Sequence, residues 1–157
     1  MTDFRFEILS LKDLDKVIDA EQRSHQFPWS EKNFKDCIDN AYWNYVLVDI
    51  LAERNILGHC IVMPGVEELH LLNITICPEY RRENIASRTL IAIEETGLSK
   101  GYHRILLEVR RSNLPAIYLY EKIGYQLIGA RKDYYPSTLQ GNNSREDALV
   151  MEKVLVR

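Results

Sequence analysis

Cysteine is scarce in this sequence of 157 residues, and its few copies exclude some classes of protein. The three cysteines are Cys37, Cys60 and Cys77, an odd number, with no Cys-x-x-Cys pair and no set of Cys and His at metal-ligand spacing. A disulfide framework or a zinc site is therefore not expected. We predict that all three are reduced thiols in or near the core of a cytoplasmic protein.

Long apolar runs are also missing. No run approaches the ~20 residues that a helix needs to cross a bilayer, and the polar segment MTDFRFE lacks the apolar region of a signal peptide. The formal net charge of −3 argues against a nucleic-acid binder that relies on neutralising phosphates. We therefore expect a cytoplasmic protein that binds neither membrane nor nucleic acid, and we favour a monomer.

Repeats, low-complexity tracts and linkers are absent as well, so we expect residues 1–157 to form a single domain. Strand-like and helix-like segments alternate along the chain, which indicates a mixed α/β (α+β) fold. The predicted strands cover residues 4–8, 45–50, 56–63, 69–76, 104–109, 125–130 and 147–153, and a long loop is predicted between the last two.

The stretch from Leu69 to Leu90 organises the sequence. Its apolar first part predicts a strand buried on both faces, which Pro78 ends because proline has no N–H to give to a ladder. A short polar turn and an amphipathic helix follow. N–H groups of the turn and of the first helical turn point to one spot, and Arg81 and Arg82 add two positive charges beside it. We interpret the stretch as a pyrophosphate cradle; the alternative is an ordinary strand–helix connection with surface arginines.

The run ICPEYRRENIA, residues 76–86, resembles the acetyl-CoA signature of the GCN5-related N-acetyltransferases, the GNAT superfamily. Asn84 departs from that signature, because the family has glycine at this position. Asn is the non-glycine residue that best tolerates a positive φ, so the turn can still form at some cost. The resemblance implies acetyl-CoA as co-substrate and the GNAT fold. That fold is a twisted, mostly antiparallel sheet that is flanked by helices and splayed by a bulge at the acetyl-CoA strand.

Two side chains further along are candidates for acid–base chemistry. Glu108 lies among apolar residues of a predicted strand, where a partly desolvated carboxylate suits a general base. Tyr120 lies on the inward stripe of the next predicted helix, and its phenol can give a proton to a leaving thiolate. The alternatives are a strand residue ion-paired with Arg110 and an ordinary core tyrosine.

A second resemblance covers nearly the whole chain. The segments EQRSHQFPWS (21–30) and LEVRRSN (107–113) and the Tyr-Tyr-Pro of 134–136 are similar to the RimI-type ribosomal-protein alanine N-acetyltransferases. The pattern over 113–125 is similar to the second acetyltransferase motif. The resemblance implies that Glu108 is the base, that Tyr120 is the acid and that Asn113 contacts the pantetheine arm.

The same resemblance implies the donor-binding residues. Three strand residues would lend backbone groups to the acetyl group and the pantetheine: Ile74, Thr75 and Ile76. The turn and the helix start would cradle the pyrophosphate: Arg82, Glu83, Asn84, Ile85, Ala86 and Ser87.

The acceptor implied by the resemblance is the N-terminal amine of an alanine on a small-subunit ribosomal protein, the eighteenth. Near neutral pH, deprotonating an α-amine of pKa about 7.8 costs about 1 kcal/mol, against about 4.6 kcal/mol for a lysine. One carboxylate base therefore suits the α-amine, by direct attack on the thioester. Two alternatives stay open: a small-amine or antibiotic acetyltransferase of the same fold, and a non-catalytic CoA-binding module.

The histidines are not expected to bind a metal. His25 lies in the aromatic segment before Trp29, where it could contact a peptide, although a plain surface histidine is the simpler interpretation. His59 alternates with apolar strand residues and is predicted to be a satisfied core or edge group.

Overall fold

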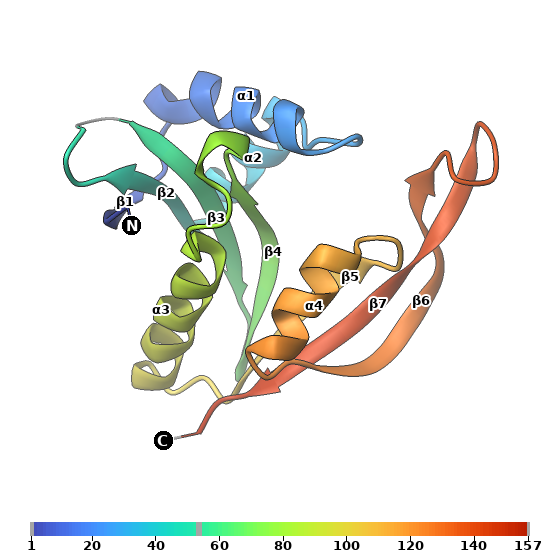
Figure 1. Cartoon of the computed structure of the whole chain (residues 1–157). Coiled ribbons are helices and arrows are strands. Elements are labelled where there is room, and N and C mark those ends of the chain that lie inside the picture. Colours follow the sequence, from blue (N-terminus) through green and yellow to red (C-terminus); the bar gives the residue numbers. More distant parts are fainter. Residues whose placement is uncertain (1, 53–54, 157) are drawn as a thin grey trace. The chain divides into compact units, whose positions relative to one another are not determined.

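The computed structural model describes residues 2–52 and 55–156, which form two compact units (Figure 1). Unit 1 holds the described residues up to Pro64 together with Leu71–Ala92, and unit 2 holds Gly65–His70 together with the described residues from Ile93 onward. The strands follow the order β1-β2-β3-β4-β5-β7-β6 in a seven-stranded sheet. Its pairs β1–β2, β2–β3, β5–β7 and β6–β7 are antiparallel, which confirms the expected mixed α/β class.

Unit 1 carries the N-terminal helices and strands. Its elements are β1 (Phe4–Ile8), the 3-10 helix η1 (Leu11–Asp13), α1 (Leu14–Ser24), α2 (Glu31–Asp39), β2 (Trp43–Asp49), β3 (Ile56–Pro64), most of β4 (Glu68–Ile76), the 3-10 helix η2 (Pro78–Tyr80) and the start of α3 (Ile85–Ser99). Ser30 caps α2 by accepting a hydrogen bond from the Asn33 N–H at 3.2 Å.

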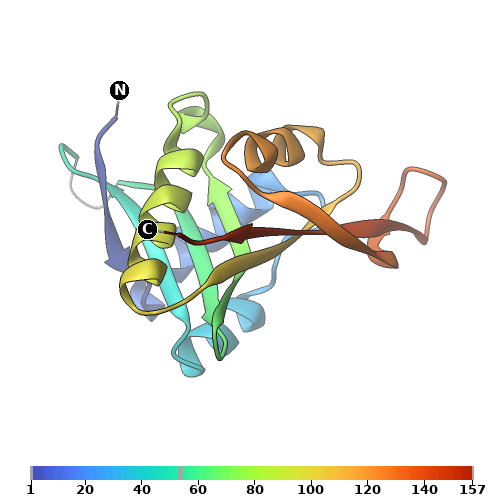
Figure 2. The ribbon, with the colours of Figure 1, turned by 90° about the horizontal axis from the view of Figure 1, so that it is seen from below.

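Both faces of the strands in unit 1 are covered. Alternate residues of β2 point to opposite faces, so Val46 and Val48 pack with α1 and α2 while Leu47 packs with Ile85 at the start of α3. Figure 2 shows α3 in front of β2 and β3, with α1 and α2 behind them. Apolar residues on both faces explain why these strands read as nearly continuous hydrophobic runs in the sequence.

Gly58 of β3 sets the distance between β3 and the end of β4, the strand that carries the candidate acetyl-CoA residues 74–76 and is called the donor strand below. A Cβ at Gly58 would lie 2.2 Å from the Thr75 carbonyl oxygen and 3.1 Å from the Ile76 Cα. Both neighbours are backbone atoms, so no side chain can move aside to make room. The chain therefore needs glycine at position 58 to bring the two strands together beside Thr75 and Ile76.

Unit 2 carries the C-terminal elements, namely the first residues of β4, the end of α3, β5 (Arg104–Arg110), α4 (Leu114–Lys122), β6 (Gln126–Ser137) and β7 (Ser144–Val154). Ile105, Leu107 and Val109 of β5 are buried, as the alternation predicted. The strand period therefore places Glu108 on the opposite face of β5.

The Tyr-Tyr-Pro segment corrects an expectation. It was predicted to lie in a loop, but Tyr134, Tyr135 and Pro136 belong to β6, where Tyr135 pairs with Glu146 and Pro136 with Arg145. A register shift between Arg131 and Tyr135 allows the strand to continue past its expected end. The connection between β6 and β7 therefore covers only residues 138–143.

Candidate active site

The candidate donor site in unit 1 is a strand, a turn and a helix start. β4 ends at Ile76, and the turn before α3 contains two non-glycine residues in the left-handed region, Arg82 at φ 68° and Asn84 at φ 58°. The positive φ predicted for Asn84 is confirmed, whereas that of Arg82 was not foreseen. Such residues cost on the order of 1–3 kcal/mol each, and they cluster where backbone groups serve a ligand. The turn at the N-terminus of α3, with Arg81 and Arg82 beside it, suits a diphosphate.

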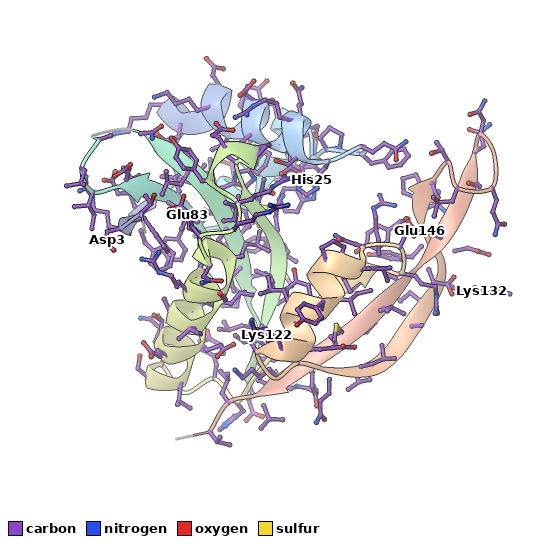
Figure 3. The ribbon with its side chains drawn as sticks, viewed as in Figure 1. Asp3, His25, Glu83, Lys122, Lys132 and Glu146 are labelled. Carbon is purple, nitrogen blue, oxygen red and sulfur yellow. The ribbon has the colours of Figure 1, made fainter. Side chains whose placement is uncertain are left out.

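One candidate donor residue already has a partner within the chain. Glu83 Oε1 accepts hydrogen bonds from the Thr2 N–H at 2.9 Å and from the Thr2 hydroxyl at 2.7 Å. Arg88 of α3 donates to the Thr2 carbonyl at 2.8 Å and lies 3.5 Å from an Asp3 oxygen (Figure 3). Glu83 therefore ties the segment before β1 to the start of α3.

The Thr75 side chain faces a buried polar network rather than the turn. Its hydroxyl lies 3.1 Å from Glu21 Oε1, 2.9 Å from Asn73 Oδ1 and 2.9 Å from His25 Nε2. Glu21 Oε1 also lies 2.9 Å from His59 Nε2 and accepts from Asn73 Nδ2 at 3.1 Å. We call these five residues the Glu21 cluster. The backbone of 74–76 is thus the part of this strand that can serve a donor.

The carboxylate of the Glu21 cluster is buried, at 2% exposure, and charged. Burial alone would raise the pKa of Glu21, but hydrogen bonds from His59 and the Trp29 N–H outweigh it and hold the pKa at about 2, below the ordinary 4.5. His59 is fully buried, which confirms its predicted place in the core. Glu21 itself was not singled out from the sequence, because its partners are 8 to 54 residues away along the chain.

Glu108 has a different environment in unit 2. It lies in β5 opposite Val150 of β7, and its side chain is 30% exposed. Its Oε2 lies 3.3 Å from Arg131 Nε, an ion pair, but forms no hydrogen bond with any described residue. Arg131, which the sequence analysis did not consider, is thus an ion-pair partner of Glu108, and the Glu108 Oε2 accepts no hydrogen bond from the described residues.

Tyr120 and Asn113 lie on α4 and at its start, also in unit 2. Tyr120 is 7% exposed, and its ring centroid lies 5.7 Å from that of Tyr125. Asn113 is the N-cap of α4, where its Oδ1 accepts from the Ala116 N–H at 3.3 Å. The cap uses the amide oxygen of Asn113, so its Nδ2 is the group that can donate to a pantetheine carbonyl. Tyr118 of the same helix is 68% exposed.

An arginine that the sequence analysis considered only as a partner for Glu108 organises the surroundings of Tyr135. Arg110 donates to the Pro136 carbonyl at 2.6 Å and to Glu146 Oε1 at 3.0 Å, and it lies 4.5 Å from the centroid of the Tyr135 ring. Glu146, labelled in Figure 3, also accepts from the Ser112 N–H at 3.1 Å. Burial and then the Glu108 charge raise the pKa of Tyr135 to about 12, so its phenol is a neutral hydrogen-bonding group near Glu108.

Side chains of β7 hold the irregular part of β6 that precedes Tyr135. Asp133 has a φ of 49°, and its N–H donates to Asp147 Oδ1 at 3.0 Å. Arg145 donates to the carbonyls of Asp133 at 2.9 Å and of Tyr134 at 2.6 Å. These bonds satisfy backbone groups that the register shift removes from the ladder.

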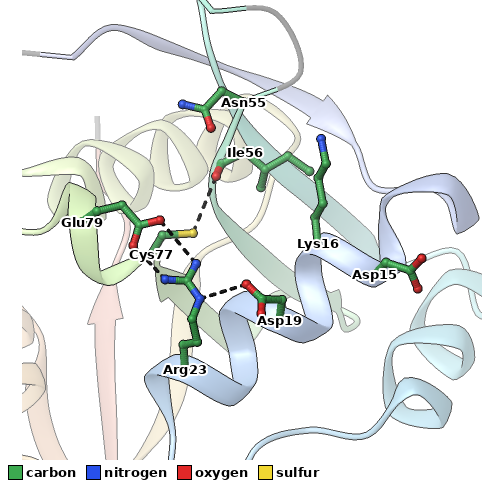
Figure 4. Close-up of a pocket in the computed structure, with 8 residues that line it drawn as sticks. All are labelled: Asp15, Lys16, Asp19, Arg23, Asn55, Ile56, Cys77 and Glu79. Atoms are coloured by element: carbon green, nitrogen blue, oxygen red, sulfur yellow. Dashed lines mark hydrogen bonds and ion pairs between the residues drawn. The ribbon is translucent and has the colours of Figure 1, made fainter.

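A pocket of about 320 Å³ lies in unit 1, and none of the candidate site residues lines it (Figure 4). Arg23 crosses it and pairs with Asp19 at 2.9 Å and Glu79 at 2.8 Å. Cys77 lines the same pocket. Burial and then the Glu79 charge raise the pKa of Cys77, so its nucleophilic thiolate form is disfavoured. Within residues 2–52 and 55–156 no cluster of three potential metal ligands is found, and no helix is long and apolar enough to cross a membrane.

Comparison with known proteins decides the family. The model of the acetyltransferase (GNAT) family matches residues 14–125, which include parts of both units. The chain belongs to the GNAT acetyltransferase family.

The similar proteins in this family share most of their length with this chain. The [ribosomal protein bS18]-alanine N-acetyltransferase of Escherichia coli K12 is 34% identical over 143 residues, which cover 91% of this chain and 92% of that protein. The enzyme of the same name from Haemophilus influenzae is 34% identical over 139 residues, covering 88% and 90%. The crystal structure of the Escherichia coli ribosomal-protein-S18-alanine N-acetyltransferase superposes with a TM-score of 0.86 at 32% identity, covering 99% of this chain and 96% of that one.

Membership in the GNAT family makes acetyl-CoA the co-substrate of this chain. The donor turn of unit 1 fits such a group, because two left-handed residues and two arginines precede the free N–H groups of the first turn of α3. The GNAT signature therefore survives the change from glycine to Asn84, whose backbone adopts the conformation that glycine would supply.

Proposed function

We propose that this chain transfers the acetyl group of acetyl-CoA to the N-terminal α-amine of an alanine, on ribosomal protein bS18. The observation that carries the proposal is the 34% identity, along nine tenths of the chain, to enzymes named for this reaction. The reaction would take place in the cytoplasm, with a monomer acting on the N-terminal segment of the ribosomal protein. Residues 1–157 would work as one catalytic domain, since the family match includes parts of both units.

The proposed general base is Glu108. Its side chain is 30% exposed, and its Oε2, although shielded from solvent, accepts no hydrogen bond from the described residues, so it would accept one from an amine or a bridging water. The base removes a proton from the α-ammonium, directly or through that water, so that the free amine attacks the thioester carbonyl. The neutral phenol of Tyr135, whose pKa is raised to about 12, keeps its own proton near this carboxylate.

The proposed general acid is Tyr120, which gives its proton to the thiolate that leaves when the tetrahedral intermediate collapses. The Asn113 Nδ2 would donate to the pantetheine arm, and the backbone of Ile74 to Ile76 would bind the acetyl and pantetheine groups. The residues Arg82 to Ser87 would surround the pyrophosphate. Of these, Glu83 acts indirectly, since its carboxylate already accepts from Thr2.

A competition between two amines tests the proposed acceptor. A short peptide that begins with alanine and also contains a lysine is incubated with excess acetyl-CoA, and the product is sequenced by mass spectrometry. We expect one acetyl group, on the α-amine, because that amine is cheaper to deprotonate by about 3 to 4 kcal/mol. Modification mainly on lysine, or equal rates for peptides that begin with alanine and with tryptophan, would contradict the assignment.

A second candidate, a small-amine acetyltransferase of the same fold, is tested in parallel. Spermidine and an aminoglycoside replace the peptide at matched concentrations. We expect their turnover to be far below that of the peptide, because Phe27 and the Tyr134–Pro136 segment offer aromatic contacts that suit an extended chain.

A further inference from the structure

One residue, Glu21, attaches both ends of the loop between α1 and α2, the first end through its backbone carbonyl and the second through its side chain. The His25 N–H donates to the Glu21 carbonyl at 3.1 Å, and the Trp29 N–H donates to Glu21 Oε2 at 3.0 Å. The other carboxylate oxygen, Oε1, bonds to His59 of β3 and to Asn73 and Thr75 of β4. Glu21 therefore connects the loop of residues 25–29 to the donor strand.

Stability alone does not explain a charge at this position. Taking a carboxylate out of water is costly, and an apolar side chain of similar volume often stabilises a core as well as a buried ionic network does. Unlike an apolar contact, a hydrogen-bonded network fixes the orientation of the groups that it joins, because each donor must point at a particular oxygen. The burial of Glu21, at 2% exposure, thus points to a requirement for precise placement of the loop.

The loop presents an aromatic side chain to solvent. Phe27 is 37% exposed, while Trp29 packs on Phe34 of α2 with ring centroids 5.2 Å apart. His25, labelled in Figure 3, extends from the loop toward Thr75, to which it is hydrogen-bonded at 2.9 Å. An exposed ring on a loop that is held at both ends is a rigid apolar contact, which loses little entropy when a peptide binds to it.

We propose that Glu21 is a positioning residue for the protein substrate, which holds residues 25–29 against β4 so that Phe27 contacts the peptide beyond its acetylated residue. This inference rests on the proposed function and adds a specificity-determining contact to it. Glu21 touches neither reacting group, so its effect is on peptide binding. Because the pKa of Glu21 is held at about 2, the loop stays attached at every pH at which the enzyme works.

The test is the substitution Glu21→Gln, which keeps the shape of the side chain but turns one acceptor oxygen into a donor. One of the groups that now donate to the carboxylate then loses its acceptor. With a hexapeptide that begins with alanine, we expect the KM for peptide to rise about tenfold, while kcat and the KM for acetyl-CoA change less than about twofold. With alanine amide, which has nothing beyond its first residue, variant and wild type should have the same KM.

Two further variants make the test specific. Phe27→Ala removes a partly exposed ring and should reproduce the rise in peptide KM. Asp13→Asn is the matched control, because it converts another buried carboxylate of unit 1, which accepts from the Ser10 N–H at 3.0 Å, into an amide. It should lower the melting temperature and leave the peptide KM unchanged.

Hydrogen exchange of the Trp29 amide gives a readout that needs no substrate. The N–H is bonded to a buried carboxylate in the wild type, so it should exchange at least about tenfold faster in Glu21→Gln. An unchanged peptide KM in Glu21→Gln and Phe27→Ala, with an active wild type, would overturn this inference and leave the proposed function intact. A wild type that binds CoA but acetylates no peptide would overturn the proposed function itself.

Discussion

Two carboxylates, one in each unit, show how the same side chain takes opposite roles. Glu21 in unit 1 is 2% exposed and accepts hydrogen bonds at both oxygens. Glu108 in unit 2 is 30% exposed, with an ion pair to Arg131 and an Oε2 that no described residue hydrogen-bonds. Protonating a carboxylate whose two oxygens both accept hydrogen bonds disrupts those bonds, whereas a carboxylate whose Oε2 accepts none can take a proton there without losing a hydrogen bond.

The comparison teaches that burial of an acidic residue does not by itself indicate a catalytic base. The hydrogen-bond donors around a buried carboxylate decide whether it stays ionised or can take up a proton. At Glu21 they come from β3, β4 and the loop at 25–29, and together they outweigh the cost of burial. Near Glu108, Arg110 and the Ser112 N–H donate to Glu146, and the Glu108 Oε2 accepts no hydrogen bond from the described residues.

The largest expected effect separates the two carboxylates by catalysis. Glu108→Gln keeps the size of the side chain but cannot take a proton, so kcat should fall about 10²-fold or more while the CoA affinity stays the same. Rising pH should partly restore turnover, because the free α-amine accumulates without help from a base. Steady-state kinetics over a range of pH, with calorimetry for CoA, measure both. Turnover close to wild type near neutral pH would remove Glu108 from the mechanism.

The second prediction concerns the contribution of Glu21 to the free energy of unfolding. The folded pKa of Glu21, about 2, lies below the ordinary 4.5, so its ionisation stabilises the folded state at any pH above 4.5. That contribution, about 3 kcal/mol, is lost as the pH falls from 4.5 toward 2. Wild type should therefore exceed Glu21→Gln in free energy of unfolding at neutral pH, and the gap should close in acid. Urea denaturation at a series of pH values measures it; a gap that does not depend on pH would contradict the ionised network.

The smallest effect concerns the donor turn of unit 1. Asn84 has a φ of 58°, which glycine adopts without strain, so Asn84→Gly should leave CoA binding unchanged or tighten it by less than about 1 kcal/mol. Calorimetry with CoA measures the change. The control is Asn143→Gly, which replaces a second left-handed asparagine, at φ 61° in the β6–β7 connection. A tenfold weaker CoA affinity in Asn84→Gly alone would mean that the Asn84 side chain contacts the donor.

Local chemistry explains which features could be predicted from the sequence. The apolar residues around Glu108 marked the strand β5, and Asn84 marked a left-handed turn position. Each of these signals depends on residues within a few positions of one another. The motifs around 76–86 and 107–113 carried the family resemblance for the same reason, since a short backbone segment forms most of each site.

Features that depend on distant partners escaped the sequence analysis. β6 was predicted to stop near residue 130, but Asp147 and Arg145 of β7 satisfy the backbone around Asp133 and let the strand continue to Ser137. Arg131 was not considered as a partner for Glu108, because the two residues belong to different strands. Neither contact leaves a pattern that periodicity could reveal.

The sequence by itself determined the family, the donor turn and the strand that carries Glu108, because each of these features depends on residues that are contiguous in the sequence. The tertiary structure alone decided that Glu21 is a buried, ionised anchor, since its bonding partners Trp29, His59, Asn73 and Thr75 are separated from it by 8, 38, 52 and 54 positions. A carboxylate acquires its protonation behaviour from the donors that folding brings to it. Those donors are a property of the packed chain and not of any one segment.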